Sequence, residues 1–170
     1  MPTLDSMTFP LSGHRLIEAS AGTGKTYTIS SLYLRLLLGR DPEQQRPLLA
    51  SEILVLTFTI AATEELRERI RVRVNLARSM FANPDHANDE RDDFVLALIN
   101  ESQDIEADRR LLTAALQTMD EASIFTIHGF CARILGEQSF DTGMLFNLNL
   151  EGDKNQMMQS ASEDCFRQEI

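Results

Sequence analysis

The sequence predicts an α/β protein in which a partial parallel sheet is flanked by helices. Three stretches each combine a short apolar strand, a turn and the start of a helix, and this alternation is typical of a parallel sheet with helical crossovers. The strands are expected at 16–19, 53–59 and 123–127. At 170 residues, the chain is long enough to bury a sizeable core as one domain.

The first strand leads into a loop of small residues that ends in Gly24, Lys25 and Thr26. These three residues form the closing half of a phosphate-binding P-loop, whose full pattern is G-x-x-x-x-G-K-S/T. Such a loop turns its backbone N–H groups toward an anion, and the following helix adds the positive end of its dipole. The full pattern has glycine where this chain has Ala19.

The predicted phosphate-binding residues form one continuous segment. They are Ala19, Ser20, Ala21, Gly22, Thr23, Gly24, Lys25 and Thr26. In a P-loop, the lysine reaches the β- and γ-phosphates, and the threonine hydroxyl is placed on Mg²⁺. The alternative is a turn of small residues before a helix that happens to start with lysine and threonine.

Proline and glycine residues mark the irregular segment before this loop and the end of the helix after it. Residues 1–15 contain Pro10 and Gly13 and are expected to be irregular. A helix is predicted from Gly24 to about Leu38, because apolar residues recur there at helical spacing. Gly39 is a suitable residue to end it.

The second strand, 53–59, is apolar and does not alternate, which predicts burial on both faces of the sheet. Thr59 is expected to cap a helix over 61–81. The apolar stripe of that helix consists of Leu66, Ile70, Val74, Ala77 and Phe81. Beside the stripe lie Arg67, Arg71 and Arg78, whereas Arg69 and Arg73 project from another side.

The turn after the second strand is a candidate ligand site, because open α/β sheets bind ligands at the carboxyl ends of their strands. The hydroxyls of Thr57 and Thr59 could hold a phosphate backbone, and Phe58 could stack on a base. The alternative is structural: Phe58 is a core residue, the threonines serve the strand and the cap, and the arginines form a solvated helix face.

The second half of the chain repeats the strand–turn–helix pattern once. Helices are predicted near 92–101 and 106–119, and a third strand leads into a helix from His128 to about Gln138. Thr126 and His128 are polar groups at the carboxyl end of this strand, and a structural hydrogen-bonding role is the alternative for the histidine. Residues 139–155 are expected to be irregular, and the last fifteen residues helical.

Composition indicates an ordinary soluble protein, with 43% hydrophobic residues and a net charge of −10. The acidity is concentrated after residue 81, because residues 1–81 hold ten basic and eight acidic side chains. A basic patch in the first half therefore remains compatible with the total. No signal peptide or transmembrane helix is expected, and the two cysteines, Cys131 and Cys165, lack metal-site spacing, which predicts a reducing, cytoplasmic location.

The three stretches, in this order, resemble the opening motifs of the UvrD/Rep-type superfamily 1 DNA helicases. Residues 16–26 resemble the family's ATP-binding motif, 57–70 its motif Ia, and 119–131 the segment leading into its next motif. The resemblance covers nearly the whole chain. Alanine at position 19 is usual in the helicase–nuclease branch of the family, which this chain resembles most. Many of these helicases carry Asn-Lys where this chain has Ile60-Ala61.

The resemblance implies a function for each motif. Gly22, Gly24, Lys25 and Thr26 would bind ATP and Mg²⁺. The residues placed along a single-stranded DNA track would be Thr57, Phe58, Thr59, Thr126 and His128. The parent protein would couple ATP hydrolysis to unwinding from a duplex end during double-strand break repair, together with two partner subunits. Residues 1–140 would be part of the first RecA-like motor domain, and 141–170 the start of a helical subdomain.

The catalytic carboxylates of such an ATPase are not apparent. Asp120-Glu121 is the Asp-Glu pair considered for this role, and it follows a segment of helical period instead of an apolar strand. No complete set of catalytic residues is therefore predicted. We expect the chain to be an inactive fragment with open sheet edges, which is either marginally stable or self-associates. The alternatives are a self-contained small P-loop NTPase or kinase, and a non-enzymatic interaction module with a degenerate P-loop.

Overall fold

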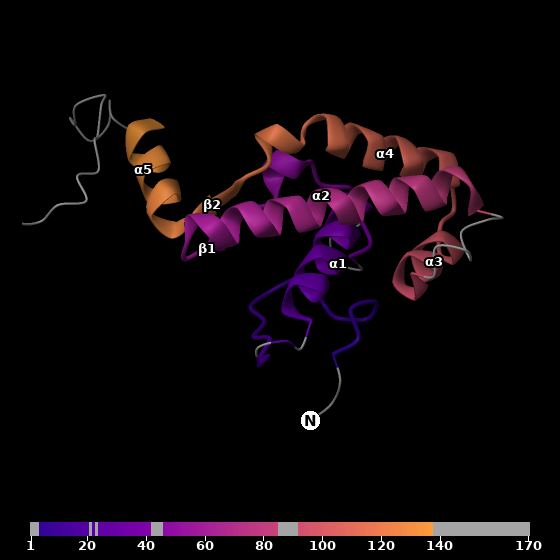
Figure 1. The fold of residues 1–170 in the computed structure, drawn as a ribbon. Coiled ribbons are helices and arrows are strands. Elements are labelled where there is room, and N and C mark those ends of the chain that lie inside the picture. The colour runs from indigo at the N-terminus through magenta and orange to yellow at the C-terminus, as the bar shows by residue number, and fades with distance from the viewer. Residues whose placement is uncertain (1–3, 21, 23, 42–45, 85–91, 138–170) are drawn as a thin grey trace, which may run out of the picture. The chain divides into compact units, whose positions relative to one another are not determined.

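The computed structural model describes residues 4–20, 22, 24–41, 46–84 and 92–137 (Figure 1). The chain divides into two compact units, Met1–Ile127 and His128–Ile170, and the second is described over 128–137. The predicted domain limit at residue 140, the irregular segment 139–155 and the C-terminal helix lie outside the described residues.

Helix α1, Lys25–Leu37, follows the small-residue loop as predicted. It ends at Gly39, which has a φ of 65°. A side chain at this position would bring its Cβ within 2.7 Å of the backbone of Arg46 and Pro47. Glycine is therefore required here both by the left-handed backbone and by the close approach of the following segment.

The N-terminal segment, 4–15, is irregular as expected, and Arg35 of α1 holds it in place. The buried Arg35 guanidinium donates hydrogen bonds to the carbonyl oxygens of Ser6 at 2.9 Å and Phe9 at 2.6 Å. One buried cation thus satisfies backbone acceptors that no regular element would pair.

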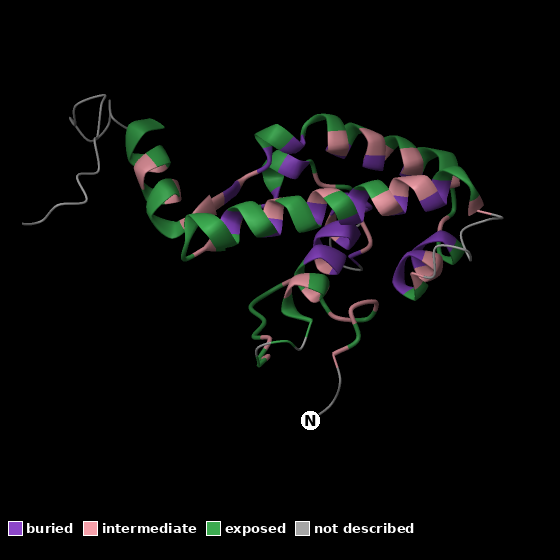
Figure 2. Ribbon diagram, in the orientation of Figure 1, coloured by how far each residue is buried: buried purple, intermediate pink, exposed green. Residues whose placement is uncertain are grey.

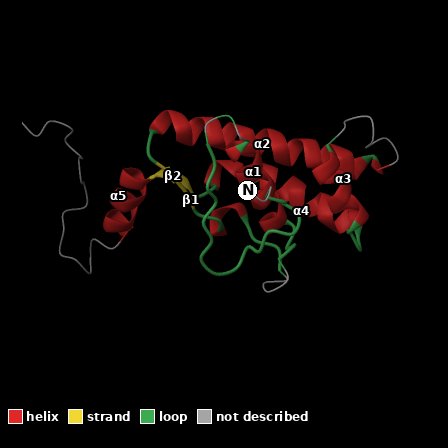
Figure 3. Cartoon of the chain, turned by 90° about the horizontal axis from the view of Figure 1, so that it is seen from below, coloured by secondary structure: helices red, strands yellow, loops and turns green. Residues whose placement is uncertain are grey.

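Two short parallel strands form the sheet of the first unit. Strand β1, Val55–Thr57, and strand β2, Ile124–Thr126, pair in register, with Thr57 opposite Thr126 (Figure 3). Each strand is preceded by a 3₁₀ turn, η1 at Ala50–Glu52 and η3 at Met119–Glu121. The second and third predicted strands are confirmed, although both are shorter than expected.

The prediction of burial on both faces of the sheet is wrong. Helix α2 packs against both strands. On β1 and its flanks, Leu54 is 46% exposed, Leu56 43% and Phe58 87%. The physical reason is that α2 covers one face, and no described element covers the face that carries these three side chains.

The prediction of a strand at 16–19 is also wrong. These residues have no strand conformation, and Leu16 is 82% exposed. A strand needs a neighbouring strand for its backbone hydrogen bonds, and in the part of the chain that the structure describes β1 and β2 pair only with each other. The described sheet therefore has two strands instead of three.

Helix α2, Ile60–Ala82, organises the core of the first unit, and its predicted limits and stripe are confirmed. Thr59 caps it by accepting a hydrogen bond from the backbone N–H of Ala62 at 3.1 Å. The stripe residues are all buried (Figure 2), namely Leu66, Ile70, Val74, Ala77 and Phe81. They face α1 and α4, the helices that α2 contacts most extensively.

Helices α3, Asp93–Asn100, and α4, Ile105–Gln117, confirm the predicted pair of helices. Each begins at an aspartate cap, because Asp92 accepts from the N–H of Val95 and Asp104 from that of Ala107. Helix α5, Ile127–Glu137, confirms the helix predicted from His128 to about Gln138 and has no buried residue. None of the described helices has the length and apolar character needed to cross a membrane.

Candidate functional site

The small-residue loop before α1 contains two glycines in the left-handed conformation. Ala19, Ser20, Gly22, Gly24, Lys25 and Thr26 belong to the described residues, whereas Ala21 and Thr23 lie outside them. Gly22 has a φ of 78° and Gly24 a φ of 85°. Residues with side chains rarely adopt this conformation, so the glycines allow the loop to turn sharply into the helix.

The start of α1 carries uncompensated positive character. Gly24 is the N-cap, no side chain caps the first turn, and the turn contains no acidic residue. The first N–H groups of a helix have no partner within the helix, and the helix dipole adds partial positive charge at the same end. A phosphate group placed here would meet both features.

Lys25 adds a full charge to this loop. Its ammonium group donates a hydrogen bond to the carbonyl oxygen of Ala19 at 2.9 Å, which closes the loop from its last residue back to its first. The Lys25 side chain is solvent-exposed. Thr26, the next residue, lies half-buried in the first turn of α1.

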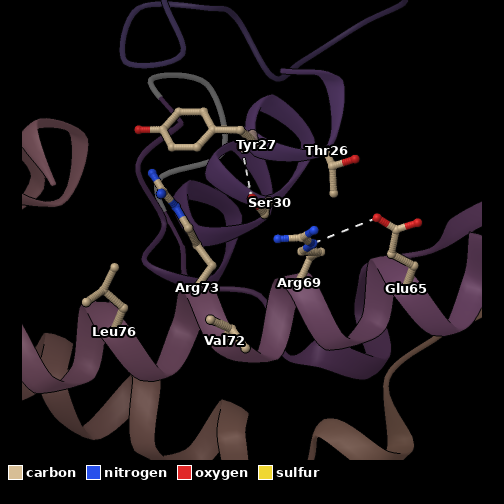
Figure 4. A pocket seen from close by; sticks show the side chains of 8 residues that line it. All are labelled: Thr26, Tyr27, Ser30, Glu65, Arg69, Val72, Arg73 and Leu76. Carbon is tan, nitrogen blue, oxygen red and sulfur yellow. Dashed lines mark hydrogen bonds and ion pairs between the residues drawn. The ribbon is translucent and has the colours of Figure 1, made fainter. Parts of the chain in front are cut away.

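A pocket of about 240 Å³ lies directly beside Thr26, between the first turn of α1 and helix α2 (Figure 4). From α1 it is lined by Thr26, Tyr27 and Ser30, and the opposite wall includes Arg69 and Arg73. The Arg69 guanidinium lies 3.8 Å from the Glu65 carboxylate, a distance that leaves it only loosely paired. The pocket therefore combines hydroxyls, an aromatic ring and cations next to the loop.

Sequence reasoning did not include Tyr27, Arg69 and Arg73 among the site residues. Their signal is present in the sequence, because Tyr27 directly follows Thr26 and the two arginines share a face of α2, four residues apart. What the sequence does not contain is the packing of α2 against α1, which turns this face toward the loop.

The Asp-Glu pair considered from the sequence as metal-binding carboxylates lies outside this loop. Asp120 and Glu121 lie in the 3₁₀ turn η3, which follows α4, and the side chain of Asp120 is 88% exposed and paired with Arg71 at 2.6 Å. Among the residues that the structure describes, no three His, Cys, Asp or Glu side chains come together as a metal site.

The turn between β1 and α2 uses its threonines within the protein. The Thr57 hydroxyl is 2.6 Å from the Thr63 hydroxyl, and the Thr59 hydroxyl accepts the capping hydrogen bond of α2. A phosphate backbone bound by these two hydroxyls, as predicted, would therefore have to compete with hydrogen bonds that they already form within the protein. The group that projects from this turn is Phe58, and at 87% exposed it is not the core residue of the structural alternative.

The parallel register places Thr126 opposite Thr57, so the carboxyl ends of both strands meet at one edge. His128 is exposed in the first turn of α5, in the second compact unit.

The three arginines beside the stripe of α2 donate hydrogen bonds to other groups of the protein. Arg67 donates to the carbonyl of Ile124 at 2.8 Å, Arg71 pairs with Asp120, and Arg78 donates to Asn75. These contacts join α2 to β2 and η3, which favours a structural role over a ligand-binding one.

The chain is similar to a family of helicases over nearly its whole length. The UvrD/REP helicase N-terminal domain family matches residues 3–169. The chain is 46% identical over 172 residues to the RecBCD enzyme subunit RecB of Escherichia coli, and 45% identical over 170 residues to that of Haemophilus influenzae. Each alignment covers 97% of this chain and 14% of the relative, so the chain spans about one seventh of the length of these relatives.

A more distant relative, the RecB subunit of Chlamydia trachomatis, is 40% identical over 136 residues, which cover 79% of this chain and 12% of that protein. The match to the family extends over almost every residue, from the N-terminal segment to the last positions. The chain belongs to the UvrD/REP helicase N-terminal domain family.

Proposed function

We propose that this chain is the nucleotide-binding part of a RecB-like, ATP-dependent DNA helicase, with a RecA-like P-loop fold in its motor domain. The observation that carries the proposal is the start of α1: two left-handed glycines, an uncapped helix terminus, and an exposed lysine directly after it. These are the elements of a polyphosphate site. The ligand that we propose for this site is ATP with Mg²⁺.

The residues present fit this ligand. Lys25 would exchange the Ala19 carbonyl for oxygens of the β- and γ-phosphates, and the first N–H groups of α1 would hold the same phosphates. The Thr26 hydroxyl would hold the magnesium ion. Bound ATP supplies the phosphoanhydride bond whose hydrolysis drives movement along DNA, while these residues bind and orient it.

The activity that we propose for the parent protein is supported by the names of the relatives and by the family. As part of a RecB-like subunit, the chain would serve ATP-coupled unwinding of DNA in recombinational repair of double-strand breaks. Its partners would be RecC-like and RecD-like subunits and a DNA duplex end, with the exonuclease activity in other parts of the parent protein. The share of 14% that the chain covers in its relatives supports assigning only the nucleotide-binding end to it.

The contact with single-stranded DNA is proposed at the edge where β1 and β2 end. Phe58 is the group best placed to stack on a base, because its ring projects from the turn. Thr57, Thr59 and Thr126 line the same edge, and His128 is proposed as a further DNA contact on the basis of the family. In this arrangement the threonine hydroxyls shape the turn, and the aromatic ring carries the binding energy.

The test is ATP binding measured by isothermal titration calorimetry in the presence of Mg²⁺. We expect Lys25→Ala to weaken binding about 10- to 100-fold, the range of a hydrogen bond to a charged group. Arg15→Ala is the matched control, since it removes a nearby exposed positive charge outside the loop. Equal affinities of the wild type and Lys25→Ala would overturn the proposal.

Turnover tests the second half of the proposal. We expect the chain alone to hydrolyse ATP negligibly with or without single-stranded DNA. The candidate metal-binding carboxylate, Asp120, is paired with Arg71 and its side chain is 88% exposed. DNA-stimulated turnover that disappears in Lys25→Ala and in Asp120→Asn or Glu121→Gln would instead identify a self-contained NTPase.

A further inference from the structure

Arg73 is a buried cation in the middle of α2 whose contacts reach two other helices. Its side chain is 8% exposed, and its guanidinium donates to both carboxylate oxygens of Asp92, at 2.6 and 3.3 Å. It also donates to the Ser31 hydroxyl at 3.0 Å. Its Nε is buried without a hydrogen-bond partner among the described residues.

The same guanidinium lies over an aromatic ring of the pocket. The Arg73 Cζ is 4.0 Å from the centroid of the Tyr27 ring, a close cation–π contact (Figure 4). It is 5.3 Å from the centroid of the Phe94 ring. Tyr27 directly follows Thr26 and is 49% exposed, so one face of its ring is covered and the residue still borders the pocket. Arg73 thereby contacts a side chain of the first turn of α1.

Stability alone does not account for this arrangement. A buried ion pair costs desolvation that its attraction only partly offsets, and well-packed apolar residues of similar volume often do as well or better. The unpaired Nε adds to that cost. An apolar residue at position 73 could not donate hydrogen bonds to Asp92 and Ser31. It would also lack the planar cation that lies over the Tyr27 ring.

We propose that Arg73, held by Asp92, is a positioning residue of the nucleotide pocket that acts through Tyr27. The inference rests on the proposed function, since it assigns the pocket beside Thr26 to the bound nucleotide. Arg73 does not touch the nucleotide. It keeps the Tyr27 ring, and with it the first turn of α1, in the orientation that the ligand meets.

The chain offers a direct spectroscopic reporter. It contains no tryptophan and only two tyrosines, Tyr27 and Tyr33. In a Tyr33→Phe background, tyrosine emission therefore comes from Tyr27 alone. We expect Mg²⁺–ATP to change this emission, and acrylamide quenching without nucleotide to report how well the ring is held.

Two variants release the ring in different ways. Arg73→Met keeps the packing of the stem and removes the charge and the fork. Asp92→Asn keeps a residue that caps α3 as well as aspartate does, but removes the charge that anchors Arg73. We expect either variant to weaken ATP binding about 5- to 30-fold, in line with a desolvated cation–π contact, and to increase quenching of Tyr27.

Asp108→Asn is the matched control. Asp108 is also buried and pairs with Arg40 at 2.5 Å, but it joins the end of α1 to α4, away from the pocket. We expect it to lower the unfolding temperature to a similar extent and to leave ATP affinity and Tyr27 emission unchanged.

The outcomes separate the two proposals. If the wild type does not bind ATP, or Lys25→Ala binds as tightly, the proposed function and this inference both fail. If Lys25→Ala loses binding while Arg73→Met and Asp92→Asn keep wild-type affinity and Tyr27 quenching, only the positioning role of Arg73 is overturned. Affinity losses in Asp108→Asn equal to those in Asp92→Asn would also overturn it, because they would reflect stability alone.

Discussion

The two tyrosines of the chain differ in their surroundings, although both belong to α1. Tyr27 is 49% exposed at the pocket, whereas Tyr33 is 2% exposed in the core. The Tyr33 hydroxyl donates to the Ala50 carbonyl at a long 3.4 Å. Burial favours the neutral phenol and raises the pKa of Tyr33 from 10.0 to about 12.

This shift predicts a loss of stability in alkali. Because the folded pKa is the higher one, Tyr33 stabilises the fold fully below pH 10.0, and its contribution is lost as the pH rises through about 12. The full loss is about 3 kcal/mol, from two pKa units at about 1.4 kcal/mol per unit. Urea unfolding of the wild type and of Tyr33→Phe from about pH 9 to about pH 12, a range that brackets the transition, measures this loss of stability. Parallel pH profiles of the two proteins would contradict the prediction.

At the scale of elements, the turn from β1 into α2 separates structural from projecting groups. Thr57 and Thr59 form hydrogen bonds that shape the turn and cap the helix, whereas Phe58 between them is 87% exposed. A cap is local, since it joins Thr59 to Ala62 three residues later. The exposed ring has no such structural partner, which leaves it available for a ligand.

This division predicts opposite effects of two neighbouring substitutions. We expect Phe58→Ala to weaken binding of a fluorescent oligodeoxythymidine by about 1–3 kcal/mol, the range for one stacked base, without lowering stability. Thr59→Ala should lower the unfolding free energy by about 1 kcal/mol through the lost cap. Fluorescence anisotropy and urea unfolding measure the two effects.

The control for the first effect is Leu16→Ala, which removes an equally exposed apolar side chain elsewhere, at 82% exposure. If Leu16→Ala weakened DNA binding as much as Phe58→Ala, the contact would be non-specific and the proposed stacking role would be wrong.

For the first compact unit as a whole, the open sheet face is the dominant feature. β1 and β2 pair only with each other among the described elements, and Leu54, Leu56 and Phe58 project from the side that α2 does not cover. Unpaired strand edges and exposed apolar side chains both favour association with another chain. This face is therefore where we expect copies of the chain to meet.

We predict that the isolated chain self-associates in a concentration-dependent way and that Leu56→Lys shifts it toward the monomer. A charge in the centre of the face would have to be desolvated on association. Sedimentation velocity over a range of concentrations measures the shift. Leu49→Lys, at a residue 63% exposed but outside the sheet, is the control and should leave association unchanged. A compact wild-type monomer at every concentration would contradict the prediction.

The sequence by itself determined the local elements of this protein. Helix limits, the caps at Thr59 and Gly39, and the α2 stripe depend on residues within a few positions of one another, where spacing and side-chain chemistry suffice. The small-residue loop before α1 belongs to the same class, because its shape follows from two glycines and the helix start.

Only the tertiary structure decided which side chains meet and which faces are covered. Arg73 reaches Ser31 and Asp92, which are 42 and 19 residues away, and Arg67 binds a carbonyl 57 residues away, so helical spacing could not separate their roles. The strand expected at 16–19 and the two-sided burial of β1 failed for the same reason. A strand's conformation and burial depend on neighbours supplied by distant parts of the chain.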